Sequence, residues 1–221
     1  MEFDSHTLLQ HYPLLLIGLW KTVYLSAISL VVGIVLGLVA CLGKLQETGL
    51  QYRLSSYFID FFRTIPEVVL IFWVYFCLPL LLDLRLSGEV CGVIALSLFS
   101  GAYLAEILRA GVSAVPRGQV EAAYALGIPV YYIWWRVILP LAVRRMMPTF
   151  VNFLTELLKA SSLLSAIGIG EMVYQASTLG ANTFRYVEFL SAVAVLYFAI
   201  ILPLSLYAWR AESRLVRRTG Q

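Results

Sequence analysis

Five long apolar segments, separated by shorter polar ones, account for most of the chain. They cover about residues 14–42, 65–82, 90–108, 147–169 and 189–209. A helix needs roughly 20 mostly apolar residues to cross the hydrocarbon core of a membrane, and each segment is close to that length. The pattern predicts an all-α membrane protein with five transmembrane helices, organised as a single domain over residues 1–221.

The longest polar interval, about residues 111–145, predicts a helix, a break and a second short helix. Glu121–Leu126 consists of strong helix formers. Gly127 suits a helix C-terminus, and Pro129 suits the start of the next helix. Pro140 is expected to end or kink the apolar and aromatic helix Val130–Leu139. Two short helices at an angle, on one face of a membrane protein, indicate a docking site for a partner.

The first apolar segment carries Gly33 and Gly37, which have GxxxG spacing. Small residues four apart share one face of a helix and allow a second helix to approach closely. The spacing therefore permits a close helix contact in this segment.

Composition supports a membrane location. Of the 221 residues, 61% are hydrophobic and 13% are charged, whereas a soluble domain carries about a quarter charged residues. Residues 1–13 hold no Lys or Arg, so we expect no secretory signal peptide. Cys41, Cys77 and Cys91 lie in apolar runs without CxxC spacing, which favours buried thiols over a disulfide or a metal site.

Basic residues are distributed unevenly between the loops on the two sides. Lys and Arg prefer cytoplasmic loops. With the N-terminus outside, the outer loops hold Arg85 and Arg185, whereas the inner loops hold eleven basic residues. These are Lys44, Arg53, Arg109, Arg117, Arg136, Arg144, Arg145, Arg210, Arg214, Arg217 and Arg218. We therefore expect the N-terminus in the periplasm, and the C-terminus and the 111–145 loop in the cytoplasm.

Several catalytic motifs are missing from the sequence. It has no GxxxxGK[ST] phosphate loop, so we do not expect this chain to bind or hydrolyse ATP. HExxH, GxSxG and Cys/His metal clusters are also absent. The sequence therefore predicts no catalytic residue and no metal site, and the chain is not expected to be an enzyme by itself. Nothing in it points to a nucleic-acid partner.

Charged residues within the predicted spans are candidates for a substrate pathway, because ionisable groups in a bilayer are costly and usually face a cavity or a partner. Arg63 and Glu67 flank Pro66 at the start of the second span. Four residues apart, the two charges would share a helix face, where they could line a pathway or only neutralise each other. Pro66 would interrupt the helix, as in many substrate sites at membrane depth.

The fourth span carries a second group of candidates. Glu156 and Lys159 are three residues apart and could pair, and the hydroxyl residues Ser161 and Ser162 follow. We favour a pathway role for Lys159, because an ammonium group in mid-span is costly. Glu106 and Arg109, near the cytoplasmic end of the third span, are better explained by pairing and by reaching toward water.

The polar interval also carries a family signature. Glu121-Ala122-Ala123, then Gly127, then Leu139-Pro140 resembles the EAA loop of permease subunits of bacterial ABC importers. Val137 departs mildly from that pattern, which usually has Ile. The resemblance implies the type I ABC importer permease fold. In this fold the EAA loop is a cytoplasmic coupling helix that docks on an ATPase, here through Glu121, Ala122, Ala123, Gly127, Leu139 and Pro140.

Other segments resemble the polar amino-acid branch of these permeases, which includes histidine and glutamine uptake systems. They are Phe62–Pro66, Tyr103–Gly111, Val115–Gln119 and Leu157–Leu163. The match covers roughly residues 15–210. Glu67 stands where this branch commonly has Leu, and Ala160 stands where Asp is common. These departures put the substrate in doubt, but not the fold.

The resemblance implies a binding-protein-dependent importer of a polar amino acid in the bacterial inner membrane. Its partners would be a pair of ATP-binding subunits, a second permease subunit that is a copy or a homologue, a solute-binding protein and membrane lipid. ATP and Mg²⁺ would be bound by the ATPase, and this chain would need no cofactor. Closure of the ATPase pair would move the coupling helices together and switch the cavity from inward-facing to outward-facing.

Three alternatives stay open. The same machine could carry another small polar solute, such as ectoine, an opine or a cystine-like compound. A channel or scaffold subunit without an ATPase would explain the spans, but not the spacing from Glu121 to Pro140. A membrane-embedded enzyme is disfavoured, because the sequence offers no catalytic cluster.

Overall fold

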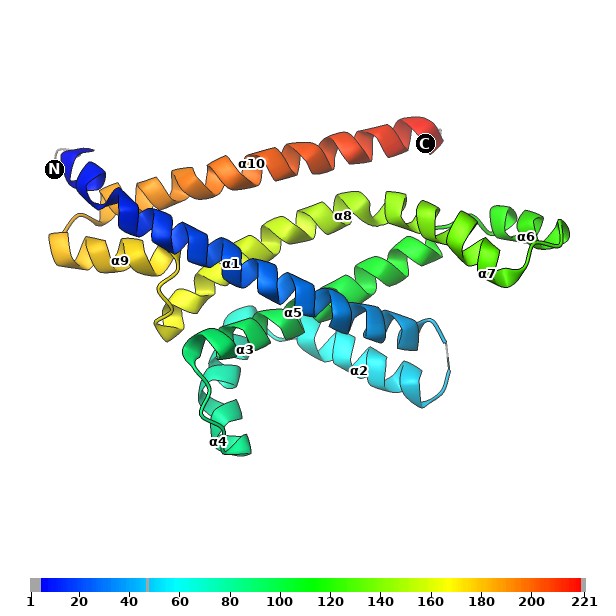
Figure 1. The fold of residues 1–221 in the computed structure, drawn as a ribbon, viewed down its shortest axis with the longest axis horizontal. Helices are drawn as coiled ribbons and strands as arrows, with labels where there is room; N and C mark the ends of the chain where they lie inside the picture. Colours follow the sequence, from blue (N-terminus) through cyan, green and yellow to red (C-terminus); the bar gives the residue numbers. More distant parts are fainter. Residues whose placement is uncertain (1–4, 47, 220–221) are drawn as a thin grey trace.

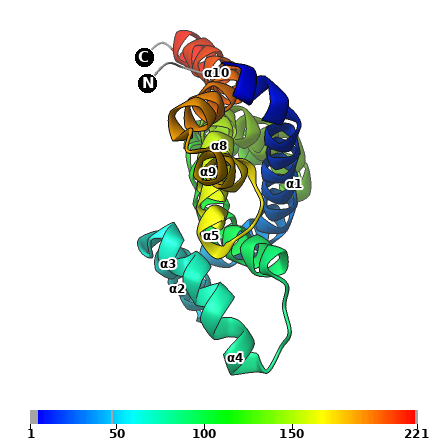
Figure 2. The same cartoon turned by 90° about the vertical axis from the view of Figure 1, so that its left-hand side faces the viewer.

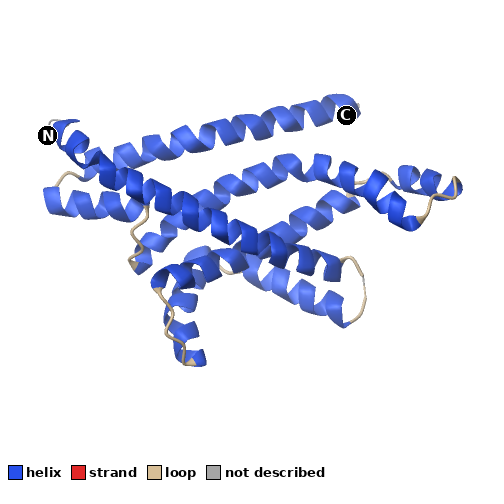
Figure 3. Ribbon diagram, viewed as in Figure 1, coloured by secondary structure: helices blue, strands red, loops and turns tan. Residues whose placement is uncertain are grey.

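The computed structural model describes residues 5–46 and 48–219, and the side chains of residues 6–46 and 48–213. The side chains of Arg214, Arg217 and Arg218, counted above among the inner basic residues, lie outside this range. Figure 3 shows helices joined by short loops, and the described residues contain no strand. The predicted all-α fold is confirmed.

Ten α-helices and three other helical turns make up the described chain. In order they are α1 (Ser5–Lys44), α2 (Leu50–Thr64), α3 (Glu67–Phe72), η1 (Trp73–Cys77), α4 (Leu78–Leu82), α5 (Gly88–Ser113), α6 (Arg117–Ala125), α7 (Val130–Ile133), η2 (Trp134–Ile138), α8 (Leu139–Ala160), η3 (Ser161–Ile167), α9 (Met172–Thr183) and α10 (Tyr186–Thr219). The turns η1 and η2 are π-helical, and η3 is a 3₁₀ helix.

Four of the described helical segments are long and apolar enough to cross a membrane: His6–Lys44, Gly88–Ser113, Val130–Ile167 and Tyr186–Ser213. Together, α2 and the segment Glu67–Leu82 are also long and apolar enough, but the chain bends by 106° between them. If this pair counts as one broken span, the described residues form five spans. Several of these segments are longer than expected. The first begins well before residue 14, and the fourth begins at Val130 rather than near residue 147.

The second span is preceded by a helix that the predicted range 65–82 did not include. The chain forms a separate helix, α2, before it, and the backbone of Ile65 is extended between α2 and α3. Pro66 caps α3, where its missing N–H costs no hydrogen bond. Figure 2 shows α2, α3 and α4 lying to one side of the other helices. The predicted interruption at Pro66 is therefore present, and it is a sharp corner.

The second helix of the 111–145 interval is not short. It runs through α7 and η2 directly into α8, and Pro140 lies in the first turn of α8 without ending it. In η2 the backbone N–H of Leu139 donates to the carbonyl of Trp134, five residues earlier. This wider turn accommodates the proline. Sequence reasoning also gave no indication of α9, the short helix between the fourth and fifth spans.

Two glycines explain how tightly α1 and α5 cross. A Cβ atom at Gly33 would overlap the Ser100 side chain, and one at Gly37 would lie 2.9 Å from Leu104 Cβ. Ser100 Oγ donates a hydrogen bond across the crossing to the carbonyl of Ser29, at 3.0 Å. The GxxxG spacing in α1 therefore forms the expected close contact, and its partner is α5.

The ends of the helices gather at two opposite ends of the molecule. Figure 1 shows the N-terminus and α9 at one end, and α6, the α1–α2 loop and the C-terminal part of α10 at the other. The main apolar core lies between them, where buried side chains of α1, α3, α5 and α8 meet; it includes Leu25, Ile71, Leu96 and Phe153.

Candidate functional site

The α6 turn has the local structure expected of the docking loop. Pro116 precedes α6, and Gly127 follows it with φ +71°, in the left-handed region that favours glycine. The N–H of Ile128 donates to the carbonyl of Ala123 at 3.2 Å, and the N–H of Gly127 donates to Tyr124. These two bonds satisfy carbonyl groups at the end of α6. Pro129 then caps α7, so α6 ends and α7 begins where the sequence predicted, although α6 begins earlier, at Arg117.

The docking residues divide into a buried and an exposed set. Ala123 is buried and packs with Val115, Ile133 and Ala142, which holds α6 against the start of the fourth span. Glu121, Ala122, Gly127, Leu139 and Pro140 are exposed. The exposed set is therefore available to a partner, and Ala123 fixes the helix that presents it.

Exposed apolar side chains surround this turn, and sequence reasoning did not single them out. They include Tyr124, Leu126, Tyr131 and Trp135, of which Leu126 is 79% exposed. Large apolar side chains at the end of a molecule mark an interaction surface. The run of aromatic residues after Pro129 was the available signal.

A cavity of about 320 Å³ lies between α2, α5 and α8. Its polar lining comes from three helices: Arg63 from α2, Tyr103 and Glu106 from α5, and Thr149, Asn152 and Glu156 from α8. The structure thus brings together two pathway candidates that are far apart in sequence, Arg63 and Glu156.

Arg63 does not pair with Glu67 as a shared helix face would have allowed. The corner at Pro66 places the two residues on different helices. Among the described side chains, Arg63 forms no ion pair, and its guanidinium carbon instead lies 5.2 Å from the centroid of the Tyr103 ring. An aromatic face holds a cation without neutralising it, so the positive charge of Arg63 stays available. Pro66 and Glu67 do not line the cavity.

Glu156 and Lys159 form the predicted pair, with Lys159 Nζ 2.6 Å from Glu156 Oε1. Both side chains are at least half exposed in the single chain. Both serines bond to the backbone of the preceding turn. Ser161 is fully buried and donates to the carbonyl of Leu158, and Ser162 donates to that of Lys159. Ser161 thus faces the interior of the molecule and not the cavity.

Glu106 joins two helices near the C-terminal ends of α1 and α5. Its carboxylate pairs with Arg109 on the same helix and lies 3.4 Å from Nζ of Lys44, at the end of α1. The pairing expected for Glu106 and Arg109 is present, and Lys44 completes it. Glu106 therefore carries no free negative charge into the cavity.

The polar lining on α8 was readable from the sequence, although we did not identify it there. Thr149, Asn152 and Glu156 follow one another at intervals of three and four residues. Such intervals place side chains on one face of a helix. A polar stripe of this kind in an apolar helix indicates a face turned to a cavity.

Comparison with known proteins places the chain in a family. Residues 18–218 match the family described as "Binding-protein-dependent transport system inner membrane component". The chain belongs to this family. It is therefore a multi-pass membrane permease of an ABC importer, as the EAA resemblance predicted.

Relatives of this permease match it over nearly their whole length. It is 34% identical to the arginine transport system permease protein ArtQ of Bacillus subtilis, over 97% of this chain and 98% of the relative. It is 37% identical to the glutamine transport system permease protein GlnP of Escherichia coli, over 97% and 99%.

Solved structures agree on the fold. The permease is similar to a chain of an amino acid ABC transporter crystallised with histidines, with a TM-score of 0.87, 30% identity and coverage of 97% of this chain and 100% of that one. An inward-facing MetNI methionine ABC transporter matches with a TM-score of 0.72 at 23% identity, over 91% and 98%. The type I importer fold is confirmed.

Proposed function

We propose that this permease imports a polar amino acid across the bacterial inner membrane, driven by ATP hydrolysis in a separate subunit. The cavity between α2, α5 and α8 carries the proposal, because the unpaired guanidinium of Arg63 and the carboxylate of Glu156 both line it. An amino-acid zwitterion offers a carboxylate and an ammonium group, which these two side chains complement. The names of the arginine and glutamine permeases that resemble this chain support the same substrate class.

Each of the two residues has a distinct proposed role. Arg63 binds the substrate carboxylate through two parallel N–H···O bonds, which a guanidinium forms more readily than an ammonium. Glu156 binds the substrate ammonium in exchange for Lys159. In the single chain both side chains are at least half exposed, so Glu156 is accessible for this exchange.

The proposed ATPase contact is the surface of α6 and the following turn. Glu121 and Ala122 are exposed there, beside the apolar side chains of Tyr124 and Leu126. This surface faces the cytoplasm, with the N-terminus in the periplasm, and the partner ATPase pair holds ATP and Mg²⁺. A second permease subunit completes the pathway, and a solute-binding protein delivers the substrate to the opposite end.

Reconstitution tests the proposal. The permease is assembled in proteoliposomes with its ATPase and solute-binding protein, and uptake is measured for a panel of amino acids, ectoine, an opine and cystine. ATP-dependent uptake of an amino acid is expected. Uptake of only a non-amino-acid solute would refute the proposed substrate class but not the ATP-driven import. Flux through the permease alone without ATP would overturn the importer mechanism.

A further inference from the structure

Glu171 is a buried carboxyl group outside the cavity and outside the α6 turn. It lies between the fourth and fifth spans, caps the N-terminus of α9, and has no exposed surface. One carboxyl oxygen accepts the N–H of Tyr174 at 2.8 Å, and the other accepts that of Val173 at 3.0 Å. Among the described residues it forms no ion pair. A buried carboxylate without a cation is costly, so Glu171 is a candidate for a functional role.

Thr22 connects this carboxyl group to α1. Its hydroxyl oxygen lies 3.4 Å from Glu171 Oε2, accepts the N–H of Met172 at 3.2 Å, and lies 3.1 Å from the carbonyl oxygen of Gly18. A Cβ atom at Gly18 would lie 2.8 Å from the Cα atom of Met172. Glycine at this position therefore lets α9 approach α1 closely enough for the hydroxyl to reach both groups.

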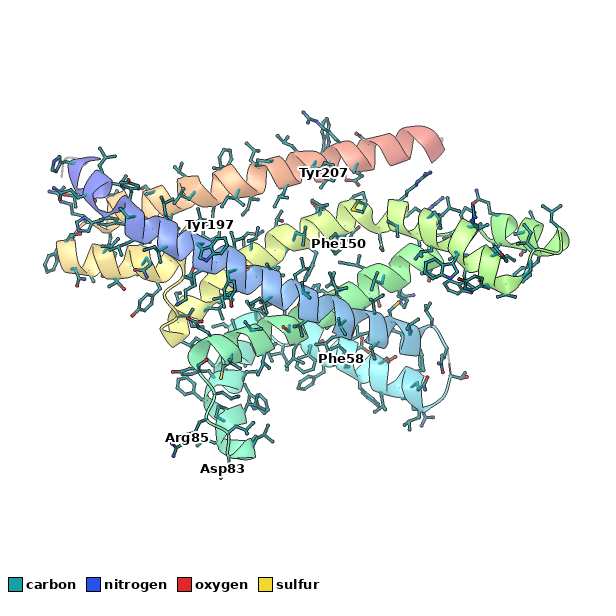
Figure 4. The ribbon with its side chains drawn as sticks, in the orientation of Figure 1. Phe58, Asp83, Arg85, Phe150, Tyr197 and Tyr207 are labelled. Carbon is teal, nitrogen blue, oxygen red and sulfur yellow. The ribbon has the colours of Figure 1, made fainter. Side chains whose placement is uncertain are left out.

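Tyr197, labelled in Figure 4, connects α10 to the same group of residues. Its buried hydroxyl lies beside those of Thr22, Ser161 and Ser162 and within electrostatic reach of Glu171, but it has no hydrogen bond of ordinary geometry in the described structure. Buried hydroxyl groups without a partner are uncommon. A small shift of α10 against α9 would give this donor an acceptor. Polar groups of α1, α9 and α10 thus lie around Glu171, and those of η3 lie beside Tyr197.

Resting on the proposed function, we propose that Glu171 is a positioning residue for transport: with Thr22 and Tyr197 it forms a latch that holds α9 on α1 and α10 and loosens when this end of the molecule opens. The helix that the latch holds, α9, lies at the end opposite to α6 (Figure 1). Hydrogen bonds, unlike interlocked apolar side chains, exchange partners without leaving a cavity. The unused hydroxyl of Tyr197 supplies such an alternative partner.

Protonation of Glu171 makes the stability of the latch depend on pH. Burial raises the pKa of Glu171 to about 7, although hydrogen bonds from the N-terminus of α9 and from Thr22 oppose this. Two titratable groups from other helices lie in this region. Tyr197 of α10 interacts electrostatically with Glu171, and Lys21 of α1, whose Nζ lies 4.0 Å from the Cβ position of the preceding residue Gly170, is paired with Glu89 of α5 at 2.6 Å. The η3 groups beside Tyr197 are the hydroxyls of Ser161 and Ser162, which do not titrate in this range.

The stability of the latch depends on pH because Glu171 binds its proton more tightly in the closed latch than in contact with water. In the closed latch Glu171 keeps its proton up to about pH 7, whereas in contact with water it would lose it near its ordinary pKa of 4.5. Opening therefore releases a proton between these values. The latch is most stable below about pH 4.5, weakens as the pH rises to about 7, and changes little above that.

The complete importer in proteoliposomes tests this inference through its ATPase activity. The ratio of hydrolysis without the solute-binding protein to hydrolysis with it measures how easily the latch opens unaided. In the wild type this ratio should rise at least about threefold between pH 6 and pH 8, since one pKa unit is a tenfold change in the protonation equilibrium. The variant Glu171→Gln, which cannot ionise, should give a flat ratio. Glu188→Gln, at another buried carboxyl in the same region, should keep the wild-type response.

A second variant keeps the test decisive if Glu171→Gln does not assemble. Thr22→Val removes a hydroxyl that stabilises the ionised carboxylate, so the midpoint of the response should move to higher pH. A pH response of Glu171→Gln equal to that of the wild type, or an unmoved midpoint in Thr22→Val, would overturn the latch. Uptake measured in the same vesicles separates the two proposals, because a wild-type complex that shows the pH response but carries no amino acid refutes only the proposed substrate.

Discussion

The guanidinium of Arg63, on α2, lies over the ring of Tyr103, on α5, at 5.2 Å from the ring centroid. This contact orients the cation toward the cavity and leaves its charge uncompensated. It is the feature that most clearly distinguishes Arg63 from the other basic residues near the cavity, because Lys159, Lys44 and Arg109 are all paired with carboxylates.

Replacement of Arg63 should impair transport without impairing assembly. We expect Arg63→Ala to lower ATP-dependent uptake at least about tenfold, since a charge-assisted bond contributes about 1.5–3 kcal/mol, and Arg63→Lys to recover part of it. Arg53→Ala, an exposed arginine on the same helix, is the matched control and should transport normally. Uptake and co-purification with the ATPase are measured together. Normal uptake by Arg63→Ala would remove it from the pathway.

The Glu156–Lys159 pair allows a double-mutant cycle. Because both side chains are at least half exposed in the single chain, we expect Glu156→Gln, Lys159→Met and the double variant each to fold and to co-purify with the ATPase. Uptake should fall in Glu156→Gln and stay low in the double variant. Recovery of uptake in the double variant would show that the pair only neutralises charge, which is the alternative that the sequence left open.

Gly127 tests the docking turn through backbone conformation. A Cβ atom there would meet nothing within 4 Å, so the cost of Gly127→Val arises from its φ of +71° and not from crowding. We expect a local cost of about 1–2 kcal/mol and loss of binding-protein-stimulated ATPase activity. Gly118→Ala, equally uncrowded but inside α6, should leave coupling intact. Equal ATPase stimulation in both variants would contradict a docking role for this turn.

The α1–α5 crossing should depend on the size of two facing residues. Gly33→Ala inserts a methyl group against Ser100, and overpacking of this kind costs about 1–3 kcal/mol. We expect a lower thermal unfolding temperature in detergent. Adding Ser100→Gly should restore much of the loss, whereas Gly118→Ala, at a helical position with nothing within 4 Å of the added Cβ, should leave the unfolding temperature unchanged. Failure of the second substitution to restore stability would mean that the crossing relaxes in another way.

The sequence predicted most of what depends on periodicity and local conformation. The GxxxG contact at Gly33 and Gly37, the glycine turn at Gly127 and the interruption at Pro66 all follow from backbone rules that act over a few residues. The angle at Pro66 and the course of the chain past Pro140 cannot be derived from such local rules, because each depends on how neighbouring helices pack. Ser161 shows the same limit, since its spacing placed it near Lys159 but not on the same side of the helix.

The burial of Glu171 could not be predicted from the sequence, for a related reason. It follows Gly170 in a short loop, where an acidic residue normally faces water. Only the folded arrangement, with Gly18 and Thr22 of α1 brought against the start of α9, turns it into a buried group. The docking roles of Glu121, Ala122, Ala123, Gly127, Leu139 and Pro140 stay predictions until an ATPase is bound.

The π-helical turn Trp134–Ile138 has a consequence for the gene as well as for the protein. Such a turn contains one residue more than an α-helical turn, so the chain before it is rotated by about 100° relative to a regular α-helix. The α6 turn lies before it and the cavity face of α8 after it. Removing a single codon from this stretch would therefore leave two sound helices pointing in the wrong relative direction. The number of residues in this stretch, more than their chemistry, determines the direction in which the α6 turn faces relative to α8.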